Sequence, residues 1–187
     1  MRNRQFSSMA VYRNIRTIHI HIPKTAGIAL GQWFAQENGD DDANVCSTPH
    51  FFLEEYLKSG VVTLDEFDGY SKIAVVRDPW ERCLSAYRYA VPFRPWMTWA
   101  DFLDWFIWAG KAAETGITFG MERLGARQAR FFGPDDGVEV VRFERLHERF
   151  PGLPVVNKSN GQDTMSEADC RRIRDVYVED FERFGYG

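Results

Sequence analysis

The chain has 187 residues, of which 44% are hydrophobic, and we expect residues 1–187 to form a single domain with its own core. Its net charge of -4 argues against a nucleic-acid-binding protein, because such proteins normally carry a basic excess. No run reaches the roughly 18 apolar residues that span a membrane, and the three widely spaced cysteines suggest neither a metal site nor disulfides. Since the start of the chain also lacks the apolar segment of a signal peptide, a cytoplasmic protein without a transmembrane segment is expected.

The first predicted strand covers residues 15–22, where isoleucines at alternate positions give the periodicity of a β-strand. Pro23 ends this strand, because proline has no N–H group to donate to a sheet. The spacing of apolar residues after Gly27 predicts a helix that ends near residues 38–39. The acidic run over residues 40–42 is expected to be a solvated loop rather than a metal site.

The second predicted strand covers residues 72–76 and is apolar enough to be buried. Asp78 is expected to cap the helix that follows, because its carboxylate can accept hydrogen bonds from backbone N–H groups of the first turn. Pro79 suits the first helical position, and the helix is expected to run to about Ala90.

The rest of the chain predicts another strand and two further helices. Thr98 and Asp101 have the spacing of a capping box at a helix start. Residues 138–143 have the pattern of a third strand, and Ser166 is expected to cap a last helix that continues through Phe184. Because strands and helices alternate, we predict an α/β fold of three layers, in which helices flank a central, mainly parallel sheet.

The first loop, residues 23–29, joins a strand to a helix, which is the geometry in which backbone N–H groups hold an anion. The expected donors are the N–H groups of five consecutive residues, Thr25, Ala26, Gly27, Ile28 and Ala29. Lys24 would add a mobile positive charge, and the Thr25 hydroxyl would be a further donor. No glycine precedes Lys24 as in a Walker A motif, so the sequence predicts a P-loop-like fold without ATP-type chemistry. An ordinary turn with an exposed lysine is the alternative.

The second loop, residues 77–79, follows the second strand. Arg77 stands at the carboxyl end of that strand, where open α/β sheets bind ligands, and its guanidinium can hold a phosphate with two hydrogen bonds. Ser85, one to two turns into the helix, can donate its hydroxyl to the same phosphate. A structural salt bridge is the alternative role for Arg77. Two anion sites in one small domain indicate a ligand that is phosphorylated at two places.

Together the two loops resemble the nucleotide-binding motifs of sulfotransferases that use 3′-phosphoadenosine 5′-phosphosulfate (PAPS). The resemblance is to the carbohydrate branch, which includes the heparan sulfate 2-O and 6-O enzymes and small microbial relatives. Residues 21–27 resemble the family's 5′-phosphosulfate loop, and residues 76–87 resemble its 3′-phosphate motif. Weaker similarities lie at Gln128 and in residues 142–146, 157–159 and 176–186.

The resemblance implies that Lys24 and residues 25–29 bind the 5′-phosphosulfate of PAPS, whereas Arg77 and Ser85 bind the 3′-phosphate. Adenosine 3′,5′-bisphosphate (PAP) would be the product, and no metal is expected because the lysine and the loop amides can neutralise the transferred group. The family usually has Thr-Ser where this chain has Ile28 and Ala29. This departure would remove two hydroxyl donors, each worth about 1 kcal/mol.

Transfer to a hydroxyl group also needs a base, and histidine suits this role because its pKa lies near neutrality. His50 lies in an irregular stretch after the first helix, and its position resembles that of the base histidine in the 6-O branch. A surface or packing role is the alternative for His50. We expect His19 and His21 to be structural and His147 to be a surface residue.

The acceptor implied by the resemblance is a hydroxyl group of a sugar or glycoconjugate. Indole rings can stack on sugars, although the helical spacing of the tryptophans here is more typical of a core: Trp96, Trp99, Trp105 and Trp108. Arg88 and Arg94 are expected to be solvated or, alternatively, to contact an anionic acceptor. The sequence therefore predicts a PAPS-dependent sulfotransferase. The alternatives are a non-catalytic module that binds PAP or PAPS and a nucleotide phosphotransferase.

Overall fold

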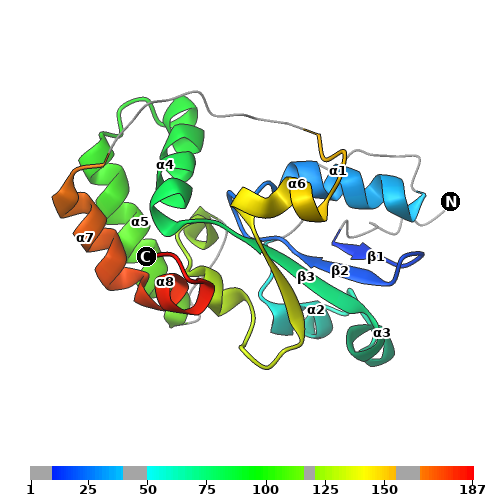
Figure 1. The fold of residues 1–187 in the computed structure, drawn as a ribbon. Helices are drawn as coiled ribbons and strands as arrows, with labels where there is room; N and C mark the ends of the chain where they lie inside the picture. Colours follow the sequence, from blue (N-terminus) through cyan, green and yellow to red (C-terminus); the bar gives the residue numbers. More distant parts are fainter. Residues whose placement is uncertain (1–9, 40–49, 116–120, 155–164) are drawn as a thin grey trace, which may run out of the picture.

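The computed structural model describes residues 10–39, 50–115, 121–154 and 165–187. Figure 1 shows a central sheet with helices on both faces. A further group of helices lies beyond the carboxyl end of the strand labelled β3. The predicted mixed α/β architecture, with a mainly parallel sheet flanked by helices, is confirmed. The acidic run over residues 40–42, Cys46 and residues 157–159 lie outside the described residues.

The sheet contains four strands in the order β1-β2-β3-β4. Strand β1 (Val11–Tyr12) is antiparallel to β2 (Thr17–Ile20), whereas β3 (Ser71–Val76) and β4 (Val138–Arg142) run parallel to β2. Because β2 and β3 are parallel neighbours, their carboxyl ends lie side by side at one edge of the sheet. The two loops singled out in the sequence therefore leave the sheet next to each other.

The helices alternate with these strands along the chain. They are α1 (Gly27–Asn38), α2 (Leu53–Lys58), α3 (Leu64–Gly69), α4 (Pro79–Ala90), α5 (Trp99–Glu114), α6 (Leu146–Arg149), α7 (Glu167–Val176) and α8 (Val178–Phe184). Short 3-10 helices are η1 (Val91–Phe93), η2 (Met121–Leu124), η3 (Gln128–Phe131) and η4 (Phe143–Arg145). The sequence did not predict α2, α3, α6 or the two-residue strand β1.

The two faces of the sheet contribute to separate hydrophobic cores. Helices α1 and α6 lie on one face (Figure 1), where Leu30 and Phe34 of α1 pack with Ile73, Val75 and Val141. On the opposite face, Ile20, Ile22, Ala74 and Val76 pack against helices α4, α5, α7 and α8. Ile18, Ile20 and Ile22 are all buried, but so are His19 and His21 between them, so burial does not alternate along this segment.

The two helices that follow the loops begin and end where the sequence predicts. Helix α1 ends at Asn38, because Gly39 adopts the left-handed conformation with φ of 76° and its N–H bonds to carbonyls of the last turn. Helix α4 begins at Pro79, and the Asp78 carboxylate accepts hydrogen bonds from the N–H groups of Trp80 and Glu81 at 2.9 and 3.0 Å. The caps expected at Thr98 and Ser166 are also present.

The prediction of one continuous last helix is wrong, because the chain forms two helices that meet at Tyr177. This residue has φ of -104° and ψ of 24°, which interrupts the helix. Its side chain is buried, and its hydroxyl lies 2.6 Å from the Gly125 carbonyl and 3.1 Å from the Phe106 carbonyl. These contacts favour a change of helix direction that the apolar spacing alone does not reveal.

No helix in the described ranges is long and apolar enough to cross a lipid bilayer.

Candidate functional site

The backbone of the first loop has the conformation of an anion-binding nest. Lys24 and Ala26 both lie in the left-handed region, with φ of 69° and 66°, and they alternate with Thr25 and the first residue of α1. Such alternation turns successive N–H groups toward one side. Ala26 precedes α1 and offers no side-chain cap, so the first N–H groups of the helix are available to an external acceptor. The loop can therefore hold an anion through its backbone.

Gly27 is required in this loop because the His21 ring occupies the space beside it. A Cβ atom at Gly27 would lie 1.7 Å from His21 Nε2, which is far inside any permitted contact. Larger residues at this position would displace either the ring or the loop. The preceding strand and the helix N-terminus thus approach each other as closely as glycine allows.

The side chains of the first loop do not lie where the sequence led us to expect. We predicted that the Thr25 hydroxyl would contact a bound phosphate, but it is buried and donates to the Ile22 carbonyl at 2.8 Å. The hydroxyl therefore stabilises the turn, and the N–H of Thr25 remains its contribution to the nest. Ile28 is 42% exposed, whereas Ala29 is 3% exposed and packs in the core beneath α1. The departure from Thr-Ser therefore matters at position 28, since a side chain at position 29 points into the core.

Lys24 lies against helix α4 and is half-buried, so the alternative of a fully exposed lysine does not describe it. Its Nζ lies 4.2 Å from the centre of the Tyr89 ring. Burial, and then the charge of Arg77, lower the pKa of Lys24 to about 8. The repulsion by Arg77 is one that a bound anion near Lys24 would relieve.

Arg77 is held by Gln128, a side chain 51 residues away in the sequence. The Arg77 N–H donates to Gln128 Oε1 at 2.8 Å, and Gln128 Nε2 donates to the Arg77 carbonyl at 2.8 Å. Gln128 is fully buried, and its own N–H donates to the Asp180 carboxylate. The Gln128 amide thus pairs with the N–H and carbonyl of Arg77 as a neighbouring strand would. These two hydrogen bonds fix the backbone of Arg77 directly after β3.

The Arg77 guanidinium forms the salt bridge that the sequence left open as an alternative. Its Nη2 lies 3.3 Å from Glu81 Oε2, and the group stacks over the Phe143 ring at 4.4 Å. Glu81 is exposed, and such i,i+4 pairs contribute only about 0.3–0.5 kcal/mol. A phosphate with two negative charges can therefore displace Glu81 at small cost.

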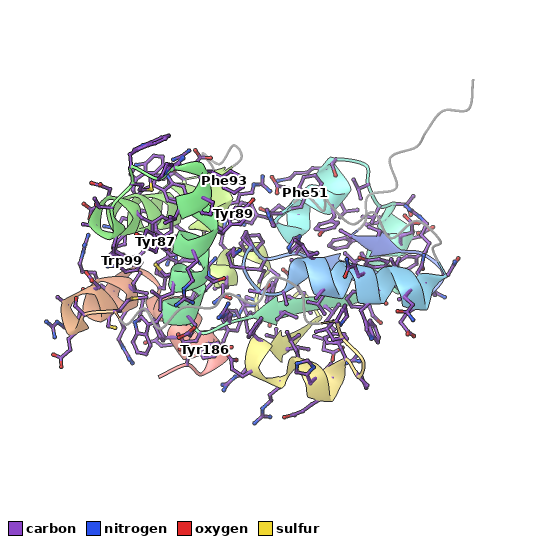
Figure 2. The ribbon with its side chains drawn as sticks, turned by 90° about the horizontal axis from the view of Figure 1, so that it is seen from above. Phe51, Tyr87, Tyr89, Phe93, Trp99 and Tyr186 are labelled. Atoms are coloured by element: carbon purple, nitrogen blue, oxygen red, sulfur yellow. The ribbon has the colours of Figure 1, made fainter. Side chains whose placement is uncertain are left out.

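Helix α4 presents Ser85 on the side that faces the first loop. Ser85 is largely buried and lies one turn before Tyr89, the residue whose ring contacts Lys24. The Asp78 carboxylate occupies the N-terminus of the same helix, so any anion bound there would have to be held by side chains rather than by these backbone N–H groups. Figure 2 shows Tyr89 and Phe93 at the end of α4, on the side toward Phe51.

His50 has the hydrogen bonding of a base with one available nitrogen. Its Nδ1 lies 3.0 Å from the His21 carbonyl, and a carbonyl only accepts, so Nδ1 carries the proton and Nε2 is the basic atom. Burial lowers the pKa of His50, and the charges of Arg123 and Lys24 lower it further against the opposing effect of the His21 hydrogen bond. The imidazole is thus neutral near pH 7, as a general base must be.

The other histidines match their expected roles. His19 is buried against Phe34, with ring centres 5.3 Å apart, and burial lowers its pKa to about 3. His21 is buried between the rings of His19 and His50. His147 lies exposed on α6.

Two buried or half-buried arginines behind the site were not assigned a role by sequence reasoning. Arg82 is fully buried and donates to the carbonyls of Leu124 and Ala126 at 3.1 and 2.7 Å. Arg123 donates to the His50 carbonyl at 2.5 Å. A charged residue within an apolar stretch was the available signal for Arg82, but its partners are some 40 residues away and have no recognisable motif.

The tryptophans do not form one site. Trp99 and Trp105 pack on the core, as expected, whereas Trp96 and Trp108 are 76% and 53% exposed, contrary to the core expectation. Arg88 and Arg94 are half-buried rather than solvated, and the charge of Arg88 lowers the pKa of Arg77.

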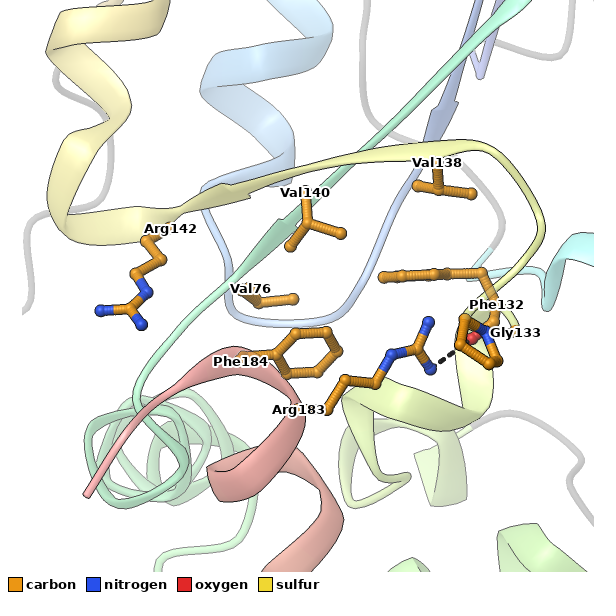
Figure 3. A pocket seen from close by; sticks show the side chains of 9 residues that line it. Val76, Phe132, Gly133, Val138, Val140, Arg142, Arg183 and Phe184 are labelled. Carbon is orange, nitrogen blue, oxygen red and sulfur yellow. Dashed lines mark hydrogen bonds between the residues drawn. The ribbon is translucent and has the colours of Figure 1, made fainter.

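A pocket of about 410 Å³ lies between β4 and α8 (Figure 3), and Val76, the last residue of β3, also lines it. Its walls include Val140, Phe132 and Phe184, with Arg142 and Arg183 at its ends. Both guanidinium groups already donate to backbone carbonyls, those of Gly185 and Phe132 respectively. None of the predicted site residues lines this pocket.

Comparison with protein-family models identifies one match, to the sulfotransferase family, over residues 8–103. This segment covers slightly more than half of the chain and contains both loops, His50 and Ser85. No curated protein and no solved structure matches the chain.

Proposed function

Because the chain belongs to the sulfotransferase family, we propose that it transfers the sulfuryl group of PAPS to a hydroxyl group of an acceptor. The observation that carries this proposal is the adjacency of two different anion-binding features. A nest with no side-chain cap follows β2, and a side-chain site at Arg77 follows β3, its parallel neighbour. PAPS carries anionic groups at both its 5′ and 3′ positions, which suits this pair of sites.

Each loop would bind one end of the nucleotide. The N–H groups of residues 25–29 and the Lys24 ammonium would hold the 5′-phosphosulfate, while Arg77 and Ser85 would hold the 3′-phosphate. Gln128 contributes by fixing the Arg77 backbone with two hydrogen bonds. In this proposal the chain is a single domain of P-loop-like fold.

The transfer step would use Lys24 and His50 on opposite sides of the sulfur atom. His50 Nε2 would take the proton of the acceptor hydroxyl as its oxygen forms a bond to sulfur. Lys24 would stabilise the negative charge that develops when the bond from sulfur to the phosphate oxygen breaks and PAP leaves. As in phosphoryl transfer, most of the acceleration would come from positioning and electrostatics.

We further propose a carbohydrate acceptor, as in the heparan sulfate branch that the two motifs resemble. Beside the sequence motifs, this is supported by the exposed rings of Tyr89 and Phe93, whose centres lie 5.7 Å apart next to Lys24. Aromatic faces bind the apolar faces of sugars. Arg88 and Arg94 on the same segment would favour an anionic glycan.

The direct test is transfer of label from [³⁵S]PAPS to a panel of unsulfated and desulfated glycans. Wild-type protein should label at least one glycan, and His50→Ala should lose transfer while its PAP affinity is kept. Lys24→Met should reduce turnover by about 100- to 1000-fold. Binding of PAP without transfer to any hydroxyl acceptor would instead favour the non-catalytic module.

A further inference from the structure

Arg123 connects His50 to helix α2 through one planar group. Its Nη1 donates to the His50 carbonyl at 2.5 Å and to Glu55 Oε2 at 2.7 Å, and its Nη2 donates to Glu55 Oε1 at 2.7 Å. The guanidinium also lies over the Phe52 ring, 4.9 Å from its centre. Arg123 belongs to η2, 73 residues after His50 and outside the segment that matches the family.

From this geometry we infer that Arg123 is a positioning residue for His50: it holds the His50 backbone so that Nδ1 stays on the His21 carbonyl and Nε2 is left to accept a proton. The inference rests on the proposed function in one respect, namely that the proton comes from the hydroxyl group of the acceptor. The arrangement itself can be tested without an acceptor or PAPS.

The Arg123–Glu55 pair is suited to this role because both partners are fixed elsewhere. Glu55 Oε2 also accepts the Phe52 N–H at 2.7 Å, at the N-terminus of α2. The planar guanidinium can donate hydrogen bonds to the His50 carbonyl and to both carboxylate oxygens of Glu55 at once. The single nitrogen of a lysine cannot donate to all three in this geometry. His50 lies outside helices and strands, so its backbone needs such a contact.

The titratable groups around His50 come from several segments. Lys24 comes from the first loop, Arg123 from η2 and Glu55 from α2, while His19 lies in β2 and His21 follows directly after it. Arg123 and Lys24 disfavour protonation of His50. Because the Glu55 carboxylate is paired with the Arg123 guanidinium, we expect its negative charge to offset part of the effect of Arg123. Loss of the Arg123 charge and loss of the Glu55 charge should therefore shift the titration of His50 in opposite directions.

A purely structural bridge between η2 and α2 would behave differently, since loss of either partner would then weaken the same contact. The tautomer and titration of His50, read by NMR of ¹⁵N-histidine-labelled protein, distinguish the two roles. The chain contains only four histidines, and a His50→Gln sample assigns the signal.

We expect wild-type protein to show the Nδ1–H tautomer of His50. Arg123→Met should raise the midpoint of its titration and mix the two tautomers. Glu55→Gln is the matched variant, because the glutamine oxygen can still accept the Phe52 N–H while the charge is lost, and it should lower the midpoint and keep the tautomer. Unchanged tautomer and midpoint in Arg123→Met, or shifts of equal sign in both variants, would overturn the inference.

Arg123→Lys keeps the test decisive if Arg123→Met does not fold. It retains the charge and loses the fork, so we expect a midpoint near the wild-type value together with mixed tautomers. A pure Nδ1–H tautomer in Arg123→Lys would contradict the positioning role. A parallel titration with PAP separates the two proposals: wild-type protein that binds no PAP yet shows the Arg123 effects refutes the proposed function and leaves the positioning role standing.

Discussion

The two loops at the carboxyl ends of β2 and β3 begin helices of equal length in opposite ways. Before α1 the cap position is Ala26, and the backbone N–H groups are left for an external partner. Before α4 the cap position is Asp78, whose carboxylate already accepts two of the N–H groups. The first loop therefore offers backbone donors and one lysine, whereas the second offers only side chains, chiefly Arg77.

This difference teaches that two motifs with the same strand–loop–helix pattern need not bind anions by the same means. A site made of backbone donors would tolerate changes of side chain, so in the proposed function Ile28 could stand where the family motif has a hydroxyl. A site made of side chains would not, and the one proposed at Arg77 is supported by Gln128 and the buried Asp180 behind it. The loops should accordingly respond differently to mutation and to pH.

The largest effect is expected at Arg77. Arg77→Ala should weaken PAP binding about tenfold to a hundredfold, because hydrogen bonds to a charged group contribute about 1.5–3 kcal/mol. Binding of 5′-AMP, which has no 3′-phosphate, should be unchanged. Calorimetric titrations with both nucleotides measure the contrast, and Arg94→Ala, which removes a neighbouring half-buried arginine, serves as the control. Equal losses for PAP and 5′-AMP would show that the two loops do not divide the ligand in this way.

A smaller effect should come from the ionisation of Lys24. The pKa of Lys24 lies at about 8 in the free protein, and a bound phosphate stabilises its charged form. Above pH 8, Lys24 must therefore take up a proton when the nucleotide binds. The protonated fraction of the free lysine falls about tenfold between pH 7 and pH 9, so PAP affinity should fall by about the same factor. The phosphates themselves stay ionised over this range.

Lys24→Met provides the comparison for this pH dependence. The variant should bind PAP more weakly than wild type at pH 7 and with little change up to pH 9. An affinity of the wild-type protein that stays constant from pH 7 to pH 9 would place the lysine outside the anion site.

The smallest effect is expected at position 28. Ile28→Thr should tighten PAP binding about fivefold, because the exposed position can supply one hydroxyl donor worth about 1 kcal/mol. Ala29→Ser is the matched variant and should give no gain, since that side chain points into the core. A gain at position 29 with none at position 28 would contradict the orientation of the first turn of α1.

The sequence was sufficient for the elements that local physical chemistry determines. The Asp78–Pro79 pair gives the start of α4, and the apolar spacing after Gly27 gives α1, almost to the residue, whereas β2 is two residues shorter at each end than the predicted strand over 15–22. The break at Tyr177 was missed because apolar spacing continues across it, while the cause is a hydroxyl bonded to carbonyls 52 and 71 residues away.

Side-chain roles in the site were predictable only in part, for a similar reason. The charge of Lys24 lowers the pKa of His50, and the charge of Arg77 lowers the pKa of Lys24, but that these residues act on one ligand stays a prediction. The Thr25 hydroxyl was misassigned, because whether a short side chain bonds a ligand or its own turn depends on the loop conformation. The contacts of Gln128 and Arg123 join segments more than 50 residues apart, and no local sequence pattern predicts them.

The central claim is that both loops bind one nucleotide that is phosphorylated at two positions. The most direct test is a calorimetric titration with PAP beside ADP, the latter with and without magnesium. We predict that PAP binds much more tightly than ADP and that magnesium makes no difference. Absence of PAP binding, or tighter binding of ADP with magnesium, would contradict the two-loop site and favour phosphotransfer chemistry instead.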